Sequence, residues 1–247
     1  MLKTPIELKY YSDKDFFTDL NISDRLTNKF LNYKNSDDGY FKRTSNMYLD
    51  RIYNSEESKV HLLTSAVICV YYNFEEIQNE DKRILVERAF ISEVGKMLWT
   101  SRCLVSNGLG QYLYGIYKTP FQGNLNDLIK NIAYINTVIK GIQKYYNVKI
   151  RYGIGLDYGS VNCYSNDYSN PNFLIFNNKT VDNSMWLSKQ ISSSTKHTIA
   201  ISNTVFDNIK DFDNNNELFV QSESYKQMYM GDVIITQLNK DINSKFK

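Results

Sequence analysis

Five carboxylates lie close to the apolar segments of this sequence and could bind a cation: Glu75, Glu76, Asp81, Asp157 and Asp182. Carboxylate oxygens are the ligands that hard divalent cations prefer, so a pair of these residues is one candidate metal site. The alternative is that Glu75, Glu76 and Asp81 are solvated residues at the start of a helix, where negative charge is favourable. Asp157 then lies in a turn, where a side-chain-to-backbone hydrogen bond is sufficient. We favour this alternative and predict no metal site.

The histidines and cysteines do not form a second candidate site. His61 and His197 each open an expected strand, so we predict neither paired metal ligation nor catalysis from them. The cysteines, Cys69, Cys103 and Cys163, are far apart and lack CxxC spacing. That pattern favours buried reduced thiols over a zinc site or a disulfide framework. No serine, histidine and aspartate follow an order typical of nucleophilic catalysis.

The composition predicts a folded protein without a nucleic-acid or membrane partner. The chain has 247 residues, of which 42% are hydrophobic and 14% aromatic, enough for a sizeable core. Its formal net charge of +2 comes without a basic run, so nucleic acid and anionic membranes have no compositional support. The first residues lack an apolar signal core, and no stretch approaches the roughly 20 apolar residues of a membrane span. We therefore expect a cytoplasmic protein.

Hydrophobic periodicity predicts the elements that must position any site. Helices are expected at residues 81–99, 125–146 and 181–192. Strands are expected at residues 60–72, 103–105, 112–117, 149–156, 173–176, 198–202 and 232–238. Residues 107–110 (Asn-Gly-Leu-Gly) are a turn signature that joins the second and third strands as a hairpin. The order predicts an α+β fold with a ferredoxin-like βαββαβ core, a largely antiparallel sheet and the helices on one face.

The N-terminal part of the chain differs in composition from the rest. Residues 1–58 are polar and rich in Asn, Asp and Lys, and we expect them to form an N-terminal arm or helical extension. Short helices are expected within it at 22–31 and 47–53. Residues 59–247 then form the main domain, which contains a polar insert at 166–172.

The stretch 151–161, RYGIGLDYGSV, is the expected centre of the sheet. Gly153 and Gly155 alternate with Ile154 and Leu156, so one face of this strand is almost bare. Glycines inside a strand usually mark a close approach of another backbone. We predict that another element lies on this face, and that the strand runs into a polar turn at 157–160.

Four segments of the chain resemble, in order and spacing, class III nucleotide cyclases. RYGIGLDYGSV is similar to the family's R-x-G-I-G-I-D-x-G-x-V strand and turn. ERAFISEVGKML (87–98) resembles the helix after the first cyclase strand, and SNGLGQYLYGIY (106–117) resembles the G-D-G hairpin. Residues 173–209 resemble the W-x-G-x-x-V-N-x-A-x-K/R-L region with the strand and helix after it. The whole is most similar to small bacterial cyclases of Pycsar anti-phage systems, which make cyclic pyrimidine nucleotides.

The resemblance implies where cyclase chemistry would take place, and the matching positions carry unsuitable residues. In the family, two aspartates hold the two divalent ions that bind the triphosphate, and their positions here are Val70 and Leu109. The family's transition-state Asn and Arg match Asp182 and Trp186. An aspartate repels the negative charge that develops on the phosphate, and a tryptophan has no positive charge to stabilise it. We expect Trp186 to be a core or interface anchor instead. In the family, one chain of a dimer supplies the metal-binding aspartates and the other supplies the Asn and Arg. This chain has neither set, so a homodimer would have no complete site.

The positions that contact the nucleotide in the family are apolar or aromatic here. The base-reading positions match Ile175 and, approximately, Val105. Tyr71 and Tyr72, beside Asn73, replace the loop that cradles the phosphates. These five residues are the candidates for nucleotide contact. Tyr71 and Tyr72 either stack on a base or pack at a dimer seam.

The sequence therefore predicts a catalytically degenerate cyclase-like protein that acts as a dimeric scaffold, regulator or nucleotide sensor, with a role in Pycsar-like anti-phage signalling. No catalytic residue, metal or cofactor is expected. The alternative is an active cyclase that makes cCMP or cUMP at a divergent metal site, and only then is Mg or Mn expected. The partners that the resemblance implies are a second copy or a related cyclase, and a nucleotide ligand.

Overall fold

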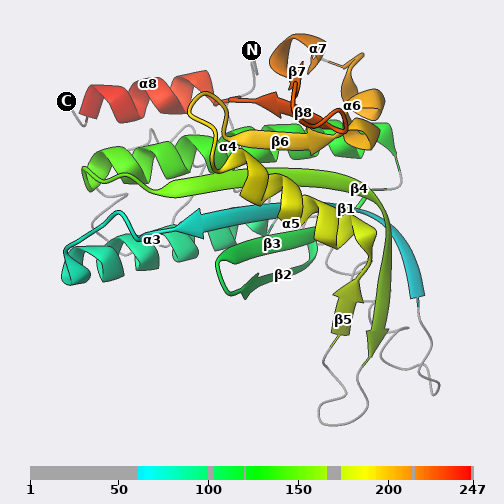
Figure 1. The fold of residues 1–247 in the computed structure, drawn as a ribbon, viewed down its shortest axis with the longest axis horizontal. Coiled ribbons are helices and arrows are strands. Elements are labelled where there is room, and N and C mark those ends of the chain that lie inside the picture. The colour runs from blue at the N-terminus through cyan, green and yellow to red at the C-terminus, as the bar shows by residue number, and fades with distance from the viewer. Residues whose placement is uncertain (1–60, 100–102, 120, 166–173, 213–214, 246–247) are drawn as a thin grey trace, which may run out of the picture.

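The structure is a computed structural model that describes residues 61–99, 103–119, 121–165, 174–212 and 215–245 (Figure 1). Its elements are, in order, β1 (His61–Asn73), α3 (Glu80–Leu98), β2 (Cys103–Leu109), β3 (Tyr112–Lys118), α4 (Gln122–Tyr145), β4 (Arg151–Ser165), β5 (Leu174–Asn177), α5 (Lys179–Ile191), β6 (Ile199–Ser202), α6 (Asn203–Ile209), α7 (Asn215–Leu218), β7 (Val220–Gln221), β8 (Met228–Gly231) and α8 (Thr236–Lys245). The run from β1 to β4 is strand, helix, strand, strand, helix, strand, which confirms the predicted βαββαβ core.

One sheet runs through the described residues in the order β2-β3-β1-β4-β6-β8-β7, with β5 paired to the far end of β4. All of these pairs are antiparallel except β4 with β6. The longest pairing joins β1 to β4, from His61 opposite Cys163 to Asn73 opposite Arg151. The predicted fold class, α+β with a largely antiparallel sheet, is confirmed.

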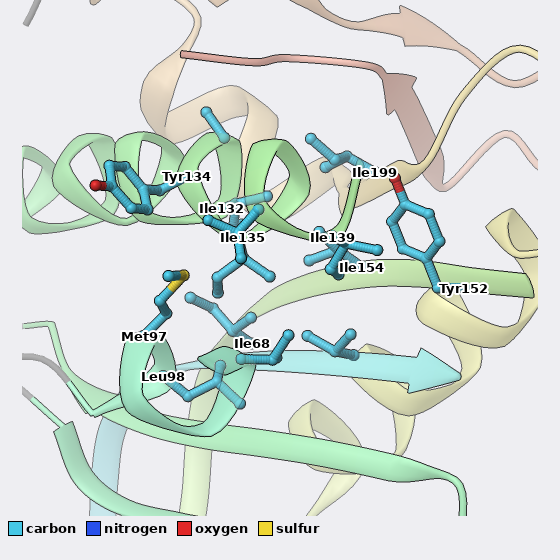
Figure 2. Close-up of a cluster of buried hydrophobic side chains, with 14 of the residues drawn as sticks. Ile68, Met97, Leu98, Ile132, Tyr134, Ile135, Ile139, Tyr152, Ile154 and Ile199 are labelled. Atoms are coloured by element: carbon cyan, nitrogen blue, oxygen red, sulfur yellow. The ribbon is translucent and has the colours of Figure 1, made fainter. Parts of the chain in front are cut away.

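A large apolar core fills the space between the sheet and the helices α3, α4, α6 and α8. Figure 2 shows its centre, where side chains from β1, α3, α4, β4 and β6 meet. Ile68, Leu98, Ile135, Ile154 and Ile199 come from these five elements, and all are 0% exposed. Burial of this apolar surface is the main force that stabilises the fold.

Helix α5 lies on the opposite face of the sheet, so the prediction that all helices share one face is wrong (Figure 1). The cause is the alternation of side chains along β4. Ile154 points into the core under α4, whereas Gly153 and Gly155 lie on the other side. A Cβ atom on Gly155 would lie only 2.7 Å from the amide nitrogen of Ser188 in α5. The predicted close approach to the glycine face is therefore confirmed, and α5 is the element that makes it.

Two predicted turns are strand in the structure. Residues 157–160 continue β4 because they pair with residues 64–67 of β1. In the hairpin, β2 extends to Leu109, and the turn falls on Gly110 and Gln111. Gly110 has a φ of 57°, a conformation that glycine adopts more readily than other residues. The hairpin is as predicted, but its turn is shifted to the end of the Asn-Gly-Leu-Gly signature.

The predicted strand at 232–238 is also wrong. The edge of β6 is taken by β8, and residues 232–235 cross to α4 without strand pairing. Side chains of α4 satisfy their backbone: the Ile235 amide donates to Thr137 Oγ1 (2.8 Å), and the Asn136 side chain donates to the Val233 carbonyl (2.9 Å). Val233 and Ile235 are buried, so the apolar pattern reflects burial against a helix. Helix α8 follows.

A hydrogen-bonded cluster, the polar tether (Asn136, Lys140, Tyr152, Thr198 and Asp232), fixes this crossing. Asn136 Oδ1 accepts from the Tyr152 hydroxyl (2.7 Å) and the Thr198 hydroxyl (2.9 Å), and Asn136 Nδ2 donates to Asp232 Oδ1 (3.0 Å). Lys140 forms an ion pair with Asp232. Burial alone would raise the pKa of Asp232, but the hydrogen bonds from Lys140, Thr198 and Asn136 outweigh it and lower the pKa. The tether therefore holds an ionised aspartate.

Several predictions lie outside the described residues: the arm at 1–58, its helices at 22–31 and 47–53, and the polar insert at 166–172. Across the part of the chain that is described, none of the helices has the length and apolar character needed to cross a bilayer. Cys69 and Cys103 are buried free thiols, as predicted.

Candidate functional site

The sheet face that carries α5 is only partly covered. Helix α5 packs on β4, β6 and β1, and β3 and β2 extend beyond it (Figure 1). Tyr71 of β1 lies opposite Tyr112 of β3, and Cys69 lies opposite Tyr114, so these four side chains share this face. Tyr71 is buried, whereas Tyr112 and Tyr114 are half-buried. Tyr71, Tyr112 and Tyr114 are called the tyrosine face below.

The side chains of the tyrosine face are aromatic rings that carry hydroxyl groups. The Tyr71 and Tyr112 rings meet edge to face with 5.3 Å between their centroids, and the Tyr71 hydroxyl donates to Gln111 Oε1 (3.4 Å). Burial raises the pKa of the Cys69 thiol to about 12, although a hydrogen bond with Ser188 acts in the opposite direction. The pKa of Tyr112 is raised by burial and then by Cys69 and Tyr71. Such a surface suits a planar ring with polar edges better than a divalent metal ion, which prefers carboxylate and carbonyl oxygens.

Val70 and Leu109, the positions matched to the two metal-binding aspartates, project from opposite faces of the sheet. Val70 is fully buried in the core under α3 and α4. Leu109 lies opposite Tyr112, which lies opposite Tyr71, so Leu109 is on the side of the tyrosine face, where it is 62% exposed. Neither side chain has an oxygen donor, and side chains on opposite faces do not share an ion. The residues present therefore do not fit a pair of divalent cations.

Asp182 and Trp186, the positions matched to the transition-state residues, lie one turn apart on α5. Asp182 is exposed. Trp186 is half-buried, and its ring stands edge-on to that of Tyr225 with 5.1 Å between the centroids. It also packs against the apolar cluster beneath α5, as expected of an anchor. Neither side chain offers the positive charge that stabilises a developing phosphate anion.

Val105 and Ile175, the positions matched to base reading, are on separate strands. Val105 lies opposite Ile116 of β3, and Ile175 lies opposite Tyr164 of β4. The strands β3, β1 and β4 stand between β2 and β5, so the two positions are four strand spacings apart, roughly 19 Å. Within one chain the structure does not bring them together.

Tyr72 and Tyr71 point to opposite sides of β1, and this changes the role of Tyr72. The Tyr72 ring lies in the main core, 5.1 Å from the Phe90 centroid and 5.3 Å from that of Phe74. Its hydroxyl donates to the Gly110 carbonyl (3.1 Å) and so ties β1 to the hairpin turn. A ring held in the core is not available to stack on a base, and Tyr71, on the other face of β1, is itself only 5% exposed.

Asn73 has a structural partner where the family has its phosphate-cradling loop. Its Oδ1 accepts from the Glu75 amide (2.7 Å), and the residue is 8% exposed. This side-chain-to-backbone bond is an Asx turn, which guides the chain from β1 toward α3. It uses the oxygen of Asn73 to fix the loop.

Of the five carboxylates considered as metal ligands, only Asp157 is buried. Its Oδ2 accepts from Asn183 Nδ2 of α5 (3.0 Å), and the residue is 7% exposed. This bond links β4 to α5, so Asp157 lies in a strand that α5 packs on, and not in a turn. The exposed carboxylates are Glu75, Glu76, Asp81 and Asp182. Within the ranges that the structure describes, no group of three His, Cys, Asp or Glu is placed to hold a metal.

Tyr112, Tyr114 and Gln111 belong to the candidate site, although the sequence pattern alone does not single them out. The two tyrosines alternate in the strand YLYGIYK, which indicates that they share a face. What the pattern does not specify is the register between β1 and β3, and only that register sets them beside Tyr71.

No family model matches this chain, and no curated protein matches its sequence. Solved structures of nucleotide cyclases match its fold. A bacterial light-regulated adenylyl cyclase matches with a TM-score of 0.55 and 12% identity, over 76% of this chain and 58% of that one. The guanylyl cyclase Cya2 matches with a TM-score of 0.54 and 10% identity, over 72% and 95%. The guanylate cyclase domain of RhGC from Catenaria anguillulae, in complex with GTP, matches with 0.51 and 17%, over 71% and 100%.

These similarities establish the fold and nothing finer. The chain spans 58% of the length of the light-regulated cyclase, and identities of 10% to 17% carry no information about activity. The described domain therefore has the fold of a nucleotide cyclase domain.

Proposed function

We propose that this chain is a catalytically inactive relative of the nucleotide cyclases, which uses the cyclase fold as a dimeric scaffold or a nucleotide sensor. The observation that supports this most strongly is the placement of Val70 and Leu109. One is fully buried under the helices and the other is 62% exposed across the sheet. Cyclisation of a triphosphate needs metal ions held by oxygen donors, and these positions supply none.

The ligand that best suits the tyrosine face is a nucleotide held without turnover. Tyr112 and Tyr114 are half-buried, so part of each residue is accessible to solvent, and Gln111 at the turn is exposed. Stacking of one base on an aromatic side chain is worth roughly 1–3 kcal/mol, and it needs no metal. The same surface suits a second copy of the chain, because half-exposed aromatic side chains are enriched at protein interfaces.

The cellular role that we propose follows from the resemblance of the motifs to Pycsar cyclases. A cytoplasmic protein that retains the fold and binds a nucleotide without converting it would regulate an active cyclase or report on nucleotide levels during phage infection. Its partner is then a second copy or the related cyclase.

The full chain should be incubated with each of the four ribonucleoside triphosphates and with Mg or Mn, and assayed for pyrophosphate and a cyclic product. We expect no turnover, and robust formation of any cyclic nucleotide would overturn the proposal of inactivity. A thermal-shift screen with the same nucleotides tests binding. A ligand present at 100 times its dissociation constant adds about 2.7 kcal/mol to stability.

Two tyrosine variants distinguish the tyrosine face from other sites. Tyr112→Ala should reduce the thermal shift caused by the nucleotide, because it removes one of the two half-buried rings on which a base could stack. Tyr225→Ala is the matched control, since Tyr225 is 37% exposed but packs on Trp186, away from this face. Equal shifts in both variants would exclude the tyrosine face as the binding site.

One observation favours the alternative of an active cyclase with a divergent site. Asp157 is a buried carboxylate on the sheet face that carries α5, and Asp182 lies exposed on that helix next to its partner Asn183. If turnover is found, Asp157→Ala and Asp182→Ala should both abolish it under this alternative. Activity that survives both substitutions would exclude these carboxylates as metal ligands.

A further inference from the structure

The strand pairing puts no lysine or arginine next to the tyrosine face. Each of its three tyrosines has a residue opposite it on both neighbouring strands of the described sheet. Apart from the tyrosines themselves, these opposite residues are Gly153, Cys69, Leu109 and Asn107. Lys118, on the same side of β3, is six residues beyond Tyr112, roughly 20 Å along the strand. The pairing therefore gives a phosphate group no cationic partner on these strands.

Two acidic groups on this side of the sheet report the charge of their surroundings. Burial raises the pKa of the Cys69 thiol to about 12 and also raises the pKa of the Tyr112 hydroxyl. After burial, the groups that raise the pKa of Tyr112 are Cys69 and Tyr71, which are themselves weak acids. A lysine or arginine beside either group would act in the opposite direction. This part of the sheet therefore disfavours an added negative charge.

The C-terminal end of α5 bounds the tyrosine face on the side of β4. Gly153, opposite Tyr71, lies directly under this end of the helix, because a Cβ atom on Gly153 would be 2.8 Å from the amide nitrogen of the C-cap residue Ser192. The C-terminal end of a helix carries a partial negative charge. This boundary is therefore also unfavourable for a phosphate group.

Two cations at this end of α5 do not make a phosphate site. Lys189 is in the last turn of the helix, and the Arg151 guanidinium donates to Ser193 Oγ just beyond it (2.8 Å). Both residues are exposed, and an ion pair with an exposed side chain is worth at most about 1 kcal/mol. A triphosphate carries several negative charges, which metal ions neutralise in enzymes of phosphoryl transfer. Two solvated side chains do not replace such ions.

We infer that the ligand of the tyrosine face is an uncharged nucleoside and not a triphosphate, an inference that rests on the proposed function of nucleotide sensing. Tyr112 and Tyr114 are both half-buried, and any base can stack on an aromatic side chain. Gln111 is exposed at the turn, and its amide can form hydrogen bonds with the edge of a base or with a ribose hydroxyl. Neither contact needs a metal ion or a phosphate.

Matched pairs of ligands test this inference. Titration calorimetry on the full chain, in EDTA and then in Mg, compares cytidine, uridine, adenosine and guanosine, each with its own 5′-triphosphate. We expect at least one nucleoside to bind, and its triphosphate to bind about tenfold more weakly under both conditions. A triphosphate that binds as tightly as its nucleoside, or more tightly, would overturn the inference and leave nucleotide sensing in place. No binding of any of the eight compounds would overturn nucleotide sensing and the inference with it.

A cation placed on the tyrosine face tests whether charge is the reason. Leu109 is 62% exposed opposite Tyr112, so Leu109→Lys adds a positive charge there without loss of a buried contact. This variant should tighten triphosphate binding about fivefold relative to nucleoside binding. Val220→Lys is the matched control, because Val220 is 52% exposed on β7, at the opposite edge of the sheet, and should leave the ratio unchanged. An equal ratio of the two dissociation constants in the wild type and both variants would overturn the inference.

Two substitutions of Tyr112 test where the nucleoside binds. Tyr112→Ala should weaken nucleoside binding about fivefold or more, because it removes a ring on which the base stacks. Tyr112→Phe keeps the ring and should retain most of the affinity. Nucleoside binding that is equally tight in the wild type and in Tyr112→Ala would place the ligand elsewhere and overturn the inference.

Discussion

The two faces of the sheet are held by different kinds of contact. Under α3 and α4, large side chains such as Ile68 and Ile135 interdigitate, and the polar tether adds hydrogen bonds at one end. On the other face, α5 lies on Gly153 and Gly155, where its backbone replaces the missing side chains. Packing under α3 and α4 depends on large side chains, whereas packing of α5 depends on β4 having no side chains at Gly153 and Gly155.

This difference explains the glycines of the cyclase-like stretch 151–161 by packing alone. Gly153 and Gly155 are the part of the motif that α5 needs for its close approach, so they serve packing. Val70 is likewise a packing residue, since it is buried in the main core. The residues that resemble the family therefore report on the fold. The proposal that the chain is inactive rests on other positions, Val70 and Leu109, whose side chains have no oxygen donors.

The largest effect is expected when an aspartate is returned to each metal-binding position. Val70→Asp should destabilise the protein by about 4 kcal/mol or more, because it buries a carboxylate among apolar side chains. Leu109→Asp should change stability by less than about 0.5 kcal/mol, since Leu109 is 62% exposed. Urea unfolding followed by circular dichroism measures both. A well-folded Val70→Asp variant would show that position 70 faces a polar site after all.

The next largest effect tests the close packing of α5 on β4. Gly155→Ala should destabilise by about 3 kcal/mol, because its Cβ would lie 2.7 Å from the Ser188 nitrogen and the backbone of α5 would have to move. Gly123→Ala is the matched control in α4, where an added Cβ meets nothing within 4 Å. It should stabilise by about 0.5 kcal/mol through helix propensity. Equal effects of the two alanines would mean that α5 does not pack closely on β4.

Much of the fold follows from local sequence signals. Apolar residues at helical spacing predict α3 and α4 to within a few residues, and the bare side of residues 153–155 predicts that an element lies on it. Two features were beyond such signals. The side of the sheet that receives α5 depends on tertiary packing. The segment 232–238 has the pattern of a strand, but its apolar residues are buried against α4.

The candidate site is less predictable than the fold because it depends on register. The residue types at Val70 and Leu109 already argue against a metal pair, but their projection from opposite faces follows only from the pairing of β1, β3 and β2. Likewise, Tyr71 and Tyr72 are equivalent in the sequence. One step of side-chain alternation puts Tyr72 in the core and Tyr71 beside Tyr112.

A pair of asparagine variants compares polar contacts on the two faces. Asn136→Ala should destabilise by about 2–3 kcal/mol, because it removes the hydrogen bonds from Asn136 to the Tyr152 hydroxyl and to the buried Val233 carbonyl. Asn183→Ala removes one bond to Asp157 and should cost about 1 kcal/mol. Both are measured by urea unfolding. A larger cost for Asn183→Ala would reverse the assignment of the polar tether as the stronger contact.

The smallest expected effect is the pH dependence from Asp232. Its pKa is lower in the folded protein than in the unfolded chain, so its ionised form contributes stability above the unfolded value of about 4. That contribution is lost as the pH falls below about 4 through the folded pKa. Asp232→Asn should therefore lose stability less steeply than the wild type in this range. Because the Asp232 side chain is 34% exposed and its partner Lys140 is 31% exposed, solvent screens the pair and the effect remains modest. Parallel curves of unfolding free energy against pH for the wild type and Asp232→Asn would mean that Asp232 is not ionised within the tether.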